Sequence, residues 1–249
     1  MASHLHKQCN YSIATTDNES DHSAKVHHFL KKLAQYDLFL KPEKCQFHQN
    51  EVEYLGIIIG GGKVQMDPVK VAGIANWPTP TTVKEVWSFL GFCNFYCAFI
   101  PTFSHIARSL NDLTKKNQKW TWENAEEAAF QTLKDICTSY PVLRTPDWSK
   151  QFILETDASG YALGAVLMQE FEDGLHPVAF HSRNLLPAEK NYDAHDKEFA
   201  GIVFGFKCSR PFLLGAKHIV KVRMDHKTLQ YFHEPQKITG RQARWIEFL

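Results

Sequence analysis

The stretch of sequence that decides the fold is FILETDASGYALGAVLMQEFEDGLHPVAFHS, residues 152–182. It contains three β-rich runs separated by Ala-Ser-Gly and by an acidic turn with a glycine, and these runs are 152–157, 161–169 and 177–182. Short runs of this kind bounded by turn residues predict three consecutive strands that form a meander.

The residues after the meander change from strand to helix and back. Apolar spacing predicts a helix over 188–207, a strand over 219–225 and a second helix that starts near Arg241. We therefore expect an α/β domain over residues 151–249. The last apolar helical pattern runs to Leu249 with neither a cap nor an exit loop, so we expect the chain to stop inside an element.

Upstream of this domain, apolar residues between Val26 and Tyr36 recur at helical spacing and predict a helix of about ten residues. The run 53–59 predicts a strand that turns at the three glycines 60–62 and returns. A phosphate-binding loop is the alternative for these glycines. The turn is favoured, because the Gly-x-x-x-x-Gly-Lys spacing and a following helix are both missing.

Residues 67–138 are predicted to be mostly helical. Asp67 precedes Pro68 as an N-cap does, and Thr82 with Glu85 has the form of a capping box. A third cap is expected at Thr121. The helix that follows Thr82 is apolar nearly all round, which predicts that it lies inside a helical cluster.

Composition limits the classes of protein that the chain could be. It has 249 residues, 44% of them hydrophobic, which is enough for one large or two modest domains and excludes disorder and fibres. The net charge of +1 gives no global basic field. Six scattered cysteines without a signal peptide predict a reduced, intracellular protein that is not secreted. No apolar run approaches the roughly 20 residues of a membrane span, so no membrane partner is expected.

Three acids fall at the ends or edges of the predicted α/β domain. Asp157 ends the first strand, Glu198 borders the packing face of the long helix, and Asp225 ends the last strand. If the first and last strands are neighbours, Asp157 and Asp225 meet at one sheet edge. Asp196 lies about 200° of helix from Glu198, so both cannot serve one site. For each acid alone, the plainer interpretation is a turn cap or a solvated side chain.

A resemblance joins these acids. The domain is similar to the RNase H domain of gypsy-type LTR-retrotransposon reverse transcriptases, through Thr156-Asp-Ala-Ser159, Tyr161-Ala-Leu-Gly-Ala-Val-Leu167, His176-Pro-Val-Ala-Phe-His-Ser-Arg183, Asn191-Tyr192, His195-Asp-Lys-Glu198 and Asp225-His-Lys227. Upstream, Leu40-Lys-Pro-Glu-Lys-Cys45, Glu53-Tyr-Leu-Gly56, Met66-Asp-Pro68, Trp77-Pro-Thr-Pro80, Phe89-Leu-Gly91, Phe99-Ile100 and Pro141-Val-Leu143 resemble the palm end, thumb and connection of the same Pol polyprotein. The match follows the family order from about residue 13 onward.

The resemblance implies a fold of the α+β or α/β class, with the end of a palm and a helical thumb before an RNase H-like mixed sheet with flanking helices. The implied parts are an irregular palm remnant (1–23), a palm helix and hairpin (24–66), the thumb (67–118), the connection (119–150) and a C-terminally truncated RNase H-like domain (151–249). In such domains the acids that match Asp157, Glu198 and Asp225 hold two Mg²⁺ ions. These ions activate a water that attacks the RNA strand of an RNA/DNA hybrid. His195 and His226 are weaker candidates, and a structural role is favoured for both.

Other family features are missing. The adjacent palm aspartates of reverse transcription are replaced by Cys9 and Asn10, which cannot substitute for hard anionic Mg²⁺ ligands. We expect no polymerase activity from this chain. The fourth RNase H acid of the family lies beyond Leu249, which makes even its nuclease activity doubtful, and Cys97-Ala98 stands where relatives have basic thumb residues.

Basic residues gather near the end of the chain. Seven bases and three acids lie between Lys217 and Leu249. The candidate contacts to the hybrid backbone are Lys217, Lys221, Arg223, Lys227, Arg241 and Arg244, with Tyr231, Phe232 and Trp245 interleaved. An ordinary solvated face is the alternative interpretation. At the level of the whole chain, the rivals are a non-catalytic or vestigial nucleic-acid-binding fragment and a chain that needs the rest of a Pol polyprotein as partner.

Two sets of potential metal ligands are given little weight. Cys93 and Cys97 have helical spacing but no His or Cys pair at zinc spacing, so two buried thiols are favoured. The pattern His4-x-His6-x-x-Cys9 lies at a terminus, where disorder is common.

Overall fold

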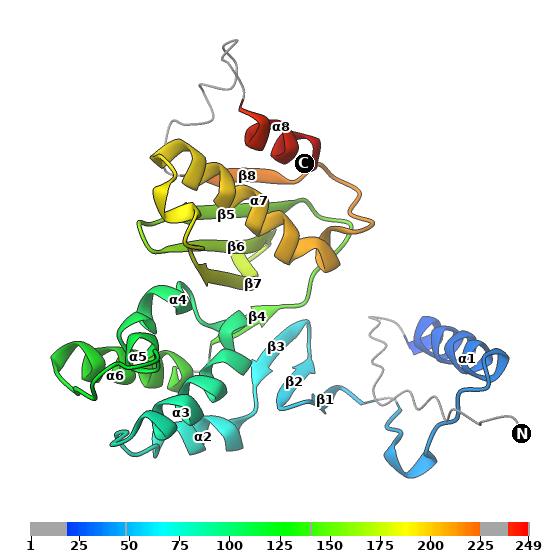
Figure 1. The fold of residues 1–249 in the computed structure, drawn as a ribbon. Coiled ribbons are helices and arrows are strands. Elements are labelled where there is room, and N and C mark those ends of the chain that lie inside the picture. Colours follow the sequence, from blue (N-terminus) through cyan, green and yellow to red (C-terminus); the bar gives the residue numbers. More distant parts are fainter. Residues whose placement is uncertain (1–18, 48, 140, 225–238, 249) are drawn as a thin grey trace, which may run out of the picture. The chain divides into compact units, whose positions relative to one another are not determined.

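The computed structural model describes residues 19–47, 49–139, 141–224 and 239–248, and it divides into two compact units, Met1–Val52 and Glu53–Leu249 (Figure 1). Asp225, His226, Lys227, Tyr231 and Phe232 lie outside the described residues, as do His4, His6, Cys9 and Asn10.

The first unit contains the helix α1 (Glu19–Gln35) and the 3₁₀ turn η1 (Pro42–Lys44). At 17 residues, α1 is longer than the roughly ten that the apolar spacing predicts. Polar residues extend it at the N-terminal end, where Lys25 forms an i,i+4 ion pair with Asp21 at 2.7 Å. Apolar periodicity alone does not detect such turns, because they bury little.

A small sheet has the strand order β1-β2-β3-β4 and comprises β1 (Glu51–Tyr54), β2 (Ile57–Gly60), β3 (Lys63–Met66) and β4 (Val142–Arg144). The single strand predicted over 53–59 is wrong, because Leu55 and Gly56 both have positive φ (50° and 78°) and divide it. The predicted glycine turn is confirmed. Gly61 and Gly62 have φ of 54° and 71°, and Gly60 pairs with Lys63 across the hairpin.

The segment between β3 and β4 is helical, as predicted. Its elements are α2 (Pro68–Ala75), α3 (Val83–Phe95), η2 (Cys97–Phe99), α4 (Phe103–Ile106), α5 (Arg108–Leu113) and α6 (Asn124–Thr138). These helices enclose one apolar core in which Phe89 and Phe130 are fully buried, with ring centroids 4.6 Å apart.

Two of the predicted helix starts are confirmed and one is wrong. Asp67 caps α2 by accepting from Val69 N at 2.8 Å, and Thr82 caps α3. However, the Glu85 carboxylate accepts its hydrogen bond from Thr81 N, at 2.7 Å, and not from Thr82 N as a capping box requires. Thr121 is not the cap of α6. Glu123 is, in a capping box with Glu126.

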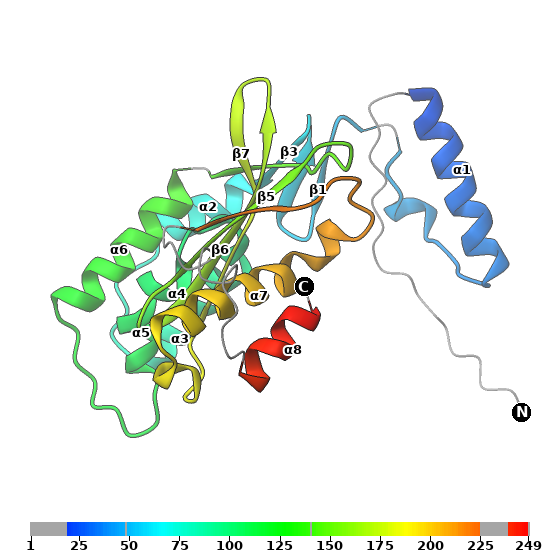
Figure 2. The ribbon, with the colours of Figure 1, turned by 90° about the horizontal axis from the view of Figure 1, so that it is seen from above.

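The second sheet has the order β7-β6-β5-β8, formed by β5 (Phe152–Ala158), β6 (Ala162–Phe171), β7 (Gly174–Asn184) and β8 (Lys221–Met224). β5, β6 and β7 are antiparallel neighbours, which confirms the meander. β8 lies parallel to β5, so the sheet is mixed and the first and last strands are neighbours. The helix α7 (Ala194–Leu213) lies across one face of this sheet, and α8 (Gly240–Phe248) packs against α7 (Figures 1 and 2).

α7 begins six residues later than predicted. Residues Glu189–Asn191 form a separate 3₁₀ turn, η3, and Asp193 caps α7 by accepting from Asp196 N at 2.7 Å. The helix also continues past the predicted end, through Pro211 to Leu213.

The helical core and the second sheet are in direct contact. Ser182 on β7 accepts a hydrogen bond from Ser104 N of α4 at 2.9 Å, and the two hydroxyl oxygens are 3.1 Å apart. Phe180 packs against the helical core. This contact brings α4 and α5 next to the sheet.

Candidate active site and nucleic-acid interface

Asp157 lies near the C-terminal end of β5, opposite Gly164 of β6. Residues along this end of the strand alternate between buried and exposed, so Thr156 is buried while Glu155 and Asp157 face solvent. Within the part of the chain that the structure describes, the Asp157 carboxylate forms no ion pair or hydrogen bond. It is therefore an available anionic oxygen ligand at a strand end.

Glycines on α7 show where the helix crosses β5. A methyl group at Gly201 would lie 3.8 Å from the Asp157 carbonyl oxygen, and one at Gly205 would lie 3.1 Å from Leu154. Gly201 therefore marks the end of β5 that bears Asp157. Glu198 precedes Gly201 by three residues, about one helical turn, and is half-buried. The backbone of Glu198 is thus at the Asp157 end of the helix–sheet interface.

The pairing of β8 with β5 leads toward the third acid. The described register ends at Thr156 opposite Met224, the residues directly before Asp157 and Asp225. Asp225 itself lies outside the described residues, and among those described no three His, Cys, Asp or Glu side chains form a group that could hold a metal.

Four of the predicted basic contacts are exposed side chains, namely Lys217, Lys221, Arg223 and Arg244. On β8 burial alternates between exposed and half-buried, which places Lys221 and Arg223 on the same, outward side, as their spacing predicts. Lys227 lies outside the described residues.

Arg241 has a different environment from these four. Its guanidinium forms an ion pair with Asp196 at 2.5 Å and lies over the Tyr192 ring, 3.8 Å from the centroid. Gln242 Nε2 donates to the other Asp196 oxygen at 2.9 Å. Asp196, only 7% exposed, therefore ties α8 to α7. The sequence indicated only that Asp196 could not share a site with Glu198, and contained no signal for this role.

Trp245 also belongs to the helix junction. Its ring packs against Phe199 at 5.4 Å and Tyr192 at 6.0 Å between centroids. The half-buried ring therefore contributes to the packing of α8 on α7, and its contact with nucleic acid stays a prediction.

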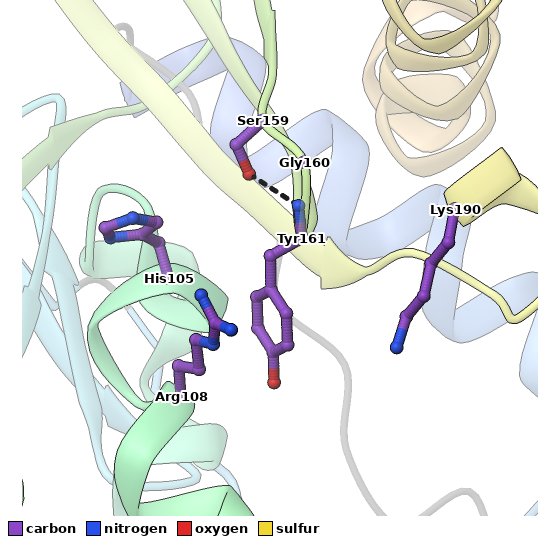
Figure 3. Close-up of a pocket in the computed structure, with 6 residues that line it drawn as sticks. All are labelled: His105, Arg108, Ser159, Gly160, Tyr161 and Lys190. Atoms are coloured by element: carbon purple, nitrogen blue, oxygen red, sulfur yellow. Dashed lines mark hydrogen bonds between the residues drawn. The ribbon is translucent and has the colours of Figure 1, made fainter. Parts of the chain in front are cut away.

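A pocket of about 390 Å³ lies at the β5–β6 turn, two residues beyond Asp157 (Figure 3). It is lined by His105, Arg108, Ser159, Gly160, Tyr161 and Lys190. The Arg108 guanidinium is 4.4 Å from the Tyr161 ring centroid. Sequence reasoning missed this pocket, because its lining comes from three segments that only the fold brings together.

The two thiols with helical spacing do not share a helix, since α3 ends at Phe95 and Cys97 lies on η2. Cys93 is buried as predicted, whereas Cys97 is only half-buried. A hydrogen bond between Cys93 and Cys137, together with burial, raises the pKa of the Cys93 thiol. A raised pKa keeps this thiol protonated, as befits a core residue.

Residues 147–249 match the family model of the RNase H-like domain found in reverse transcriptase. The chain is 36% identical over 227 residues to the retrovirus-related Pol polyprotein from transposon 297 of Drosophila melanogaster, and 35% identical over 235 residues to the transposon Tf2-3 polyprotein of Schizosaccharomyces pombe. Over residues 147–249, less than half of the chain, the sequence is similar to an RNase H-like domain of the reverse-transcriptase type. The homologues of the chain are retrotransposon Pol polyproteins, which confirms the predicted resemblance.

The matches cover 91% and 93% of this chain but 21% and 18% of the two polyproteins, so the chain spans about a fifth of the length of these relatives. Two foamy viral protease–reverse transcriptase structures cover 94% of the chain. One is a complex with double-stranded DNA (TM-score 0.68, 19% identity), and the other is a complex with an RNA/DNA hybrid (TM-score 0.67, 20% identity). At these identities the likeness shows the fold. The mixed sheet with flanking helices agrees with the RNase H-like domain.

Among the described residues, no helix has both the length and the apolar character required to span a bilayer.

Proposed function

We propose that this chain is a reverse-transcriptase segment whose RNase H-like domain hydrolyses the RNA strand of RNA/DNA hybrids with Mg²⁺. The observation that carries the proposal is the Asp157 carboxylate, which is exposed and has no cationic partner among the described residues. It lies at the strand end that Gly201 of α7 crosses, and Glu198 is one helical turn before Gly201. Asp225 is proposed as the third acid of the site. The family match and the nucleic-acid complexes of the structural neighbours support the same function.

The donor set suits a hard divalent cation. Asp157 offers two carboxylate oxygens that no described side chain neutralises, and oxygen ligands are what Mg²⁺ prefers. Asp157, Glu198 and Asp225 would hold two ions, which in such sites supply an activated water and stabilise the charge on the leaving oxygen. The part played by the protein is to keep these carboxylates at one sheet end, which the packing of α7 on β5 supports.

We propose that the residues that bind the hybrid backbone are Lys217, Lys221, Arg223, Lys227 and Arg244. Arg241 belongs to the same set but contributes less, because its charge is partly neutralised by Asp196. Phosphate contacts of this kind position a duplex without reading its sequence. We also propose the palm, thumb and connection assignments for residues 1–23, 24–66, 67–118 and 119–150, and the absence of polymerase activity. Primer extension by the purified chain in Mg²⁺ would contradict the last of these.

A hybrid-cleavage assay tests the proposed nuclease. We expect wild type to cleave the RNA strand in Mg²⁺ and Asp157→Asn to lose this activity. Glu155→Gln is the matched control, since Glu155 is exposed on the same side of β5, two residues earlier. It should cleave as wild type does.

Equal, near-zero rates for wild type and Asp157→Asn would contradict the nuclease proposal. If both proteins still bind the hybrid, the chain is a binding module.

A further inference from the structure

We propose that the pocket at the β5–β6 turn is an anion site that holds a backbone phosphate diester of the bound nucleic acid. The site is separate from the basic residues near the end of the chain, because its cations come from α4, α5 and η3. The inference rests on the proposed function, which identifies the ligand as nucleic acid. It adds a second contact to that nucleic acid, beside Asp157, that takes no part in catalysis.

The charge of the pocket is the first argument. Three of its six lining residues are bases, His105, Arg108 and Lys190, and none of the described residues that line it is an acid. All three side chains are exposed, and none forms an ion pair with a carboxylate of the described chain. Figure 3 shows Arg108 and Lys190 on opposite sides of the Tyr161 ring. Bases that line one pocket without a counter-ion attract an anion.

The acids closest in sequence to these bases already have partners. Glu189, next to Lys190, is buried, and its carboxylate accepts hydrogen bonds from both terminal nitrogens of Arg183, at 2.6 and 2.7 Å. Asp112, one turn after Arg108, forms an ion pair with Lys115 at 2.5 Å. Both of these acids are therefore already paired with cations that do not line the pocket.

The shape of the site suits a phosphate group. The Arg108 guanidinium stacks on the Tyr161 ring, and this contact limits the number of conformations of the Arg108 side chain. Less side-chain entropy is therefore lost when the guanidinium binds an anion. The Ser159 hydroxyl oxygen accepts from Tyr161 N and Ala162 N, at 3.2 and 2.9 Å, so the turn is held from within. Burial and the charge of Asp112 raise the pKa of Tyr161, so its hydroxyl stays protonated and neutral.

Position on the fold favours a polymer backbone over a free anion. The turn that forms the pocket follows Asp157 by two residues, which span at most about 7 Å of chain, so a nucleic-acid strand bound at that carboxylate would lie next to the pocket. The shared chemistry is a phosphate oxyanion, and two sources could supply it. These are a nucleic-acid diester and free phosphate, and the test must separate them.

Fluorescence anisotropy with a labelled RNA/DNA hybrid of about 20 base pairs, in EDTA so that cleavage cannot occur, measures the contact. We expect Arg108→Gln/Lys190→Gln to weaken binding about tenfold and to make the slope of log K against log [salt] less steep by about 1, the value for one lost phosphate contact. Lys63→Gln/Arg210→Gln removes the same charge from exposed positions outside the pocket and should leave the slope unchanged within about 0.3.

A second pair of variants separates charge from folding. No atom lies within 4 Å of a Cβ at Gly160, and its φ is not positive, so side chains fit there. Gly160→Asp places an acid among the three bases and should weaken hybrid binding at least as much as the double variant. Gly160→Asn has nearly the same shape without the charge and should bind within about twofold of wild type. Equal affinities for these two variants would overturn the proposal.

Calorimetry with inorganic phosphate provides the other arm. Saturable phosphate binding that depends on Arg108 and Lys190, with hybrid binding unchanged in the same variants, would assign the pocket to a free anion and overturn the proposal. A chain that binds the hybrid through Arg108 and Lys190 but does not cleave it in Mg²⁺ contradicts the nuclease and supports the pocket. If the chain cleaves the hybrid in Mg²⁺ and the Arg108 and Lys190 variants bind the hybrid as wild type does, the nuclease proposal is supported and the pocket proposal is contradicted.

Discussion

The Asp157 end of β5 and the junction of α7 with α8 treat a carboxylate in opposite ways. At the strand end, Asp157 faces solvent and has no described partner. At the junction, Asp196 is 7% exposed and accepts from both Arg241 and Gln242. The two acids have the same chemistry and lie on adjacent elements of one domain. Burial and hydrogen-bond donors separate a carboxylate that stabilises the fold from one that is available for chemistry.

Exchanging the two acids for amides should give the largest contrast. Asp157→Asn should lower hybrid cleavage by more than about 100-fold, because it removes an anionic metal ligand. Its free energy of unfolding should change by less than about 0.5 kcal/mol, as for other exposed sites. Cleavage rates and urea unfolding of the same preparation measure both effects. A stability loss of several kcal/mol would show that Asp157 is structural.

Asp196→Asn should show the reverse pattern. The variant leaves the half-buried Arg241 guanidinium without its counter-charge, which should cost about 2 kcal/mol, less than the 3–5 kcal/mol of a fully buried pair. The loss should concentrate in α8, and hydrogen exchange over 240–248 would detect it. Asp193→Asn, which retains an N-cap side chain, is the control. Undiminished protection of α8 would contradict a tie through Asp196.

The glycines of α7 sharpen the comparison along the same helix. Gly205→Ala should destabilise the protein by about 1–2 kcal/mol, because its methyl group would lie 3.1 Å from Leu154 and 3.2 Å from Ala165. Gly201→Ala meets only ordinary contacts at 3.8 Å and gains helix propensity, so its stability should be unchanged or up to about 1 kcal/mol higher. Thermal unfolding of the two variants tests this. Equal losses would mean that α7 packs as tightly at the Asp157 end as over Leu154.

The Arg183–Glu189 pair should give the smallest effect. Hydrogen bonds from Arg183 hold the pKa of Glu189 below its ordinary value. Its contribution is therefore complete above the unfolded pKa, about 4.3, and is lost as the pH falls through the folded pKa. Glu189→Gln should cost about 1 kcal/mol at pH 7 and much less at pH 3. Unfolding at the two pH values measures the difference. If Glu189→Gln lowered the free energy of unfolding equally at pH 7 and pH 3, the pair would make no ionic contribution.

Much of the fold was predictable because local chemistry decides it. Asp67 before Pro68, the glycines after Gly60 and the β-rich runs of the meander each determine structure within a few residues. The failures were local as well. The φ values at Leu55 and Gly56 divide a strand, and Glu123 replaces Thr121 as a cap. At the first of these places the Gly56 carbonyl accepts a hydrogen bond from the Tyr96 hydroxyl at 2.7 Å, a contact between residues 40 positions apart that short stretches of sequence do not reveal.

The sequence by itself determined the order of the elements, the strand that carries Asp157 and the resemblance to retrotransposon reverse transcriptases. Only the tertiary structure decided that Asp196 holds Arg241, 45 residues away, and that Arg108 lies over Tyr161 at the β5–β6 turn. Strands, turns and caps depend on short-range sterics and hydrogen bonds, which short stretches of sequence contain. The burial of a charge and the presence of three bases around one pocket depend on which distant segments pack together, and that is settled only when the whole core forms.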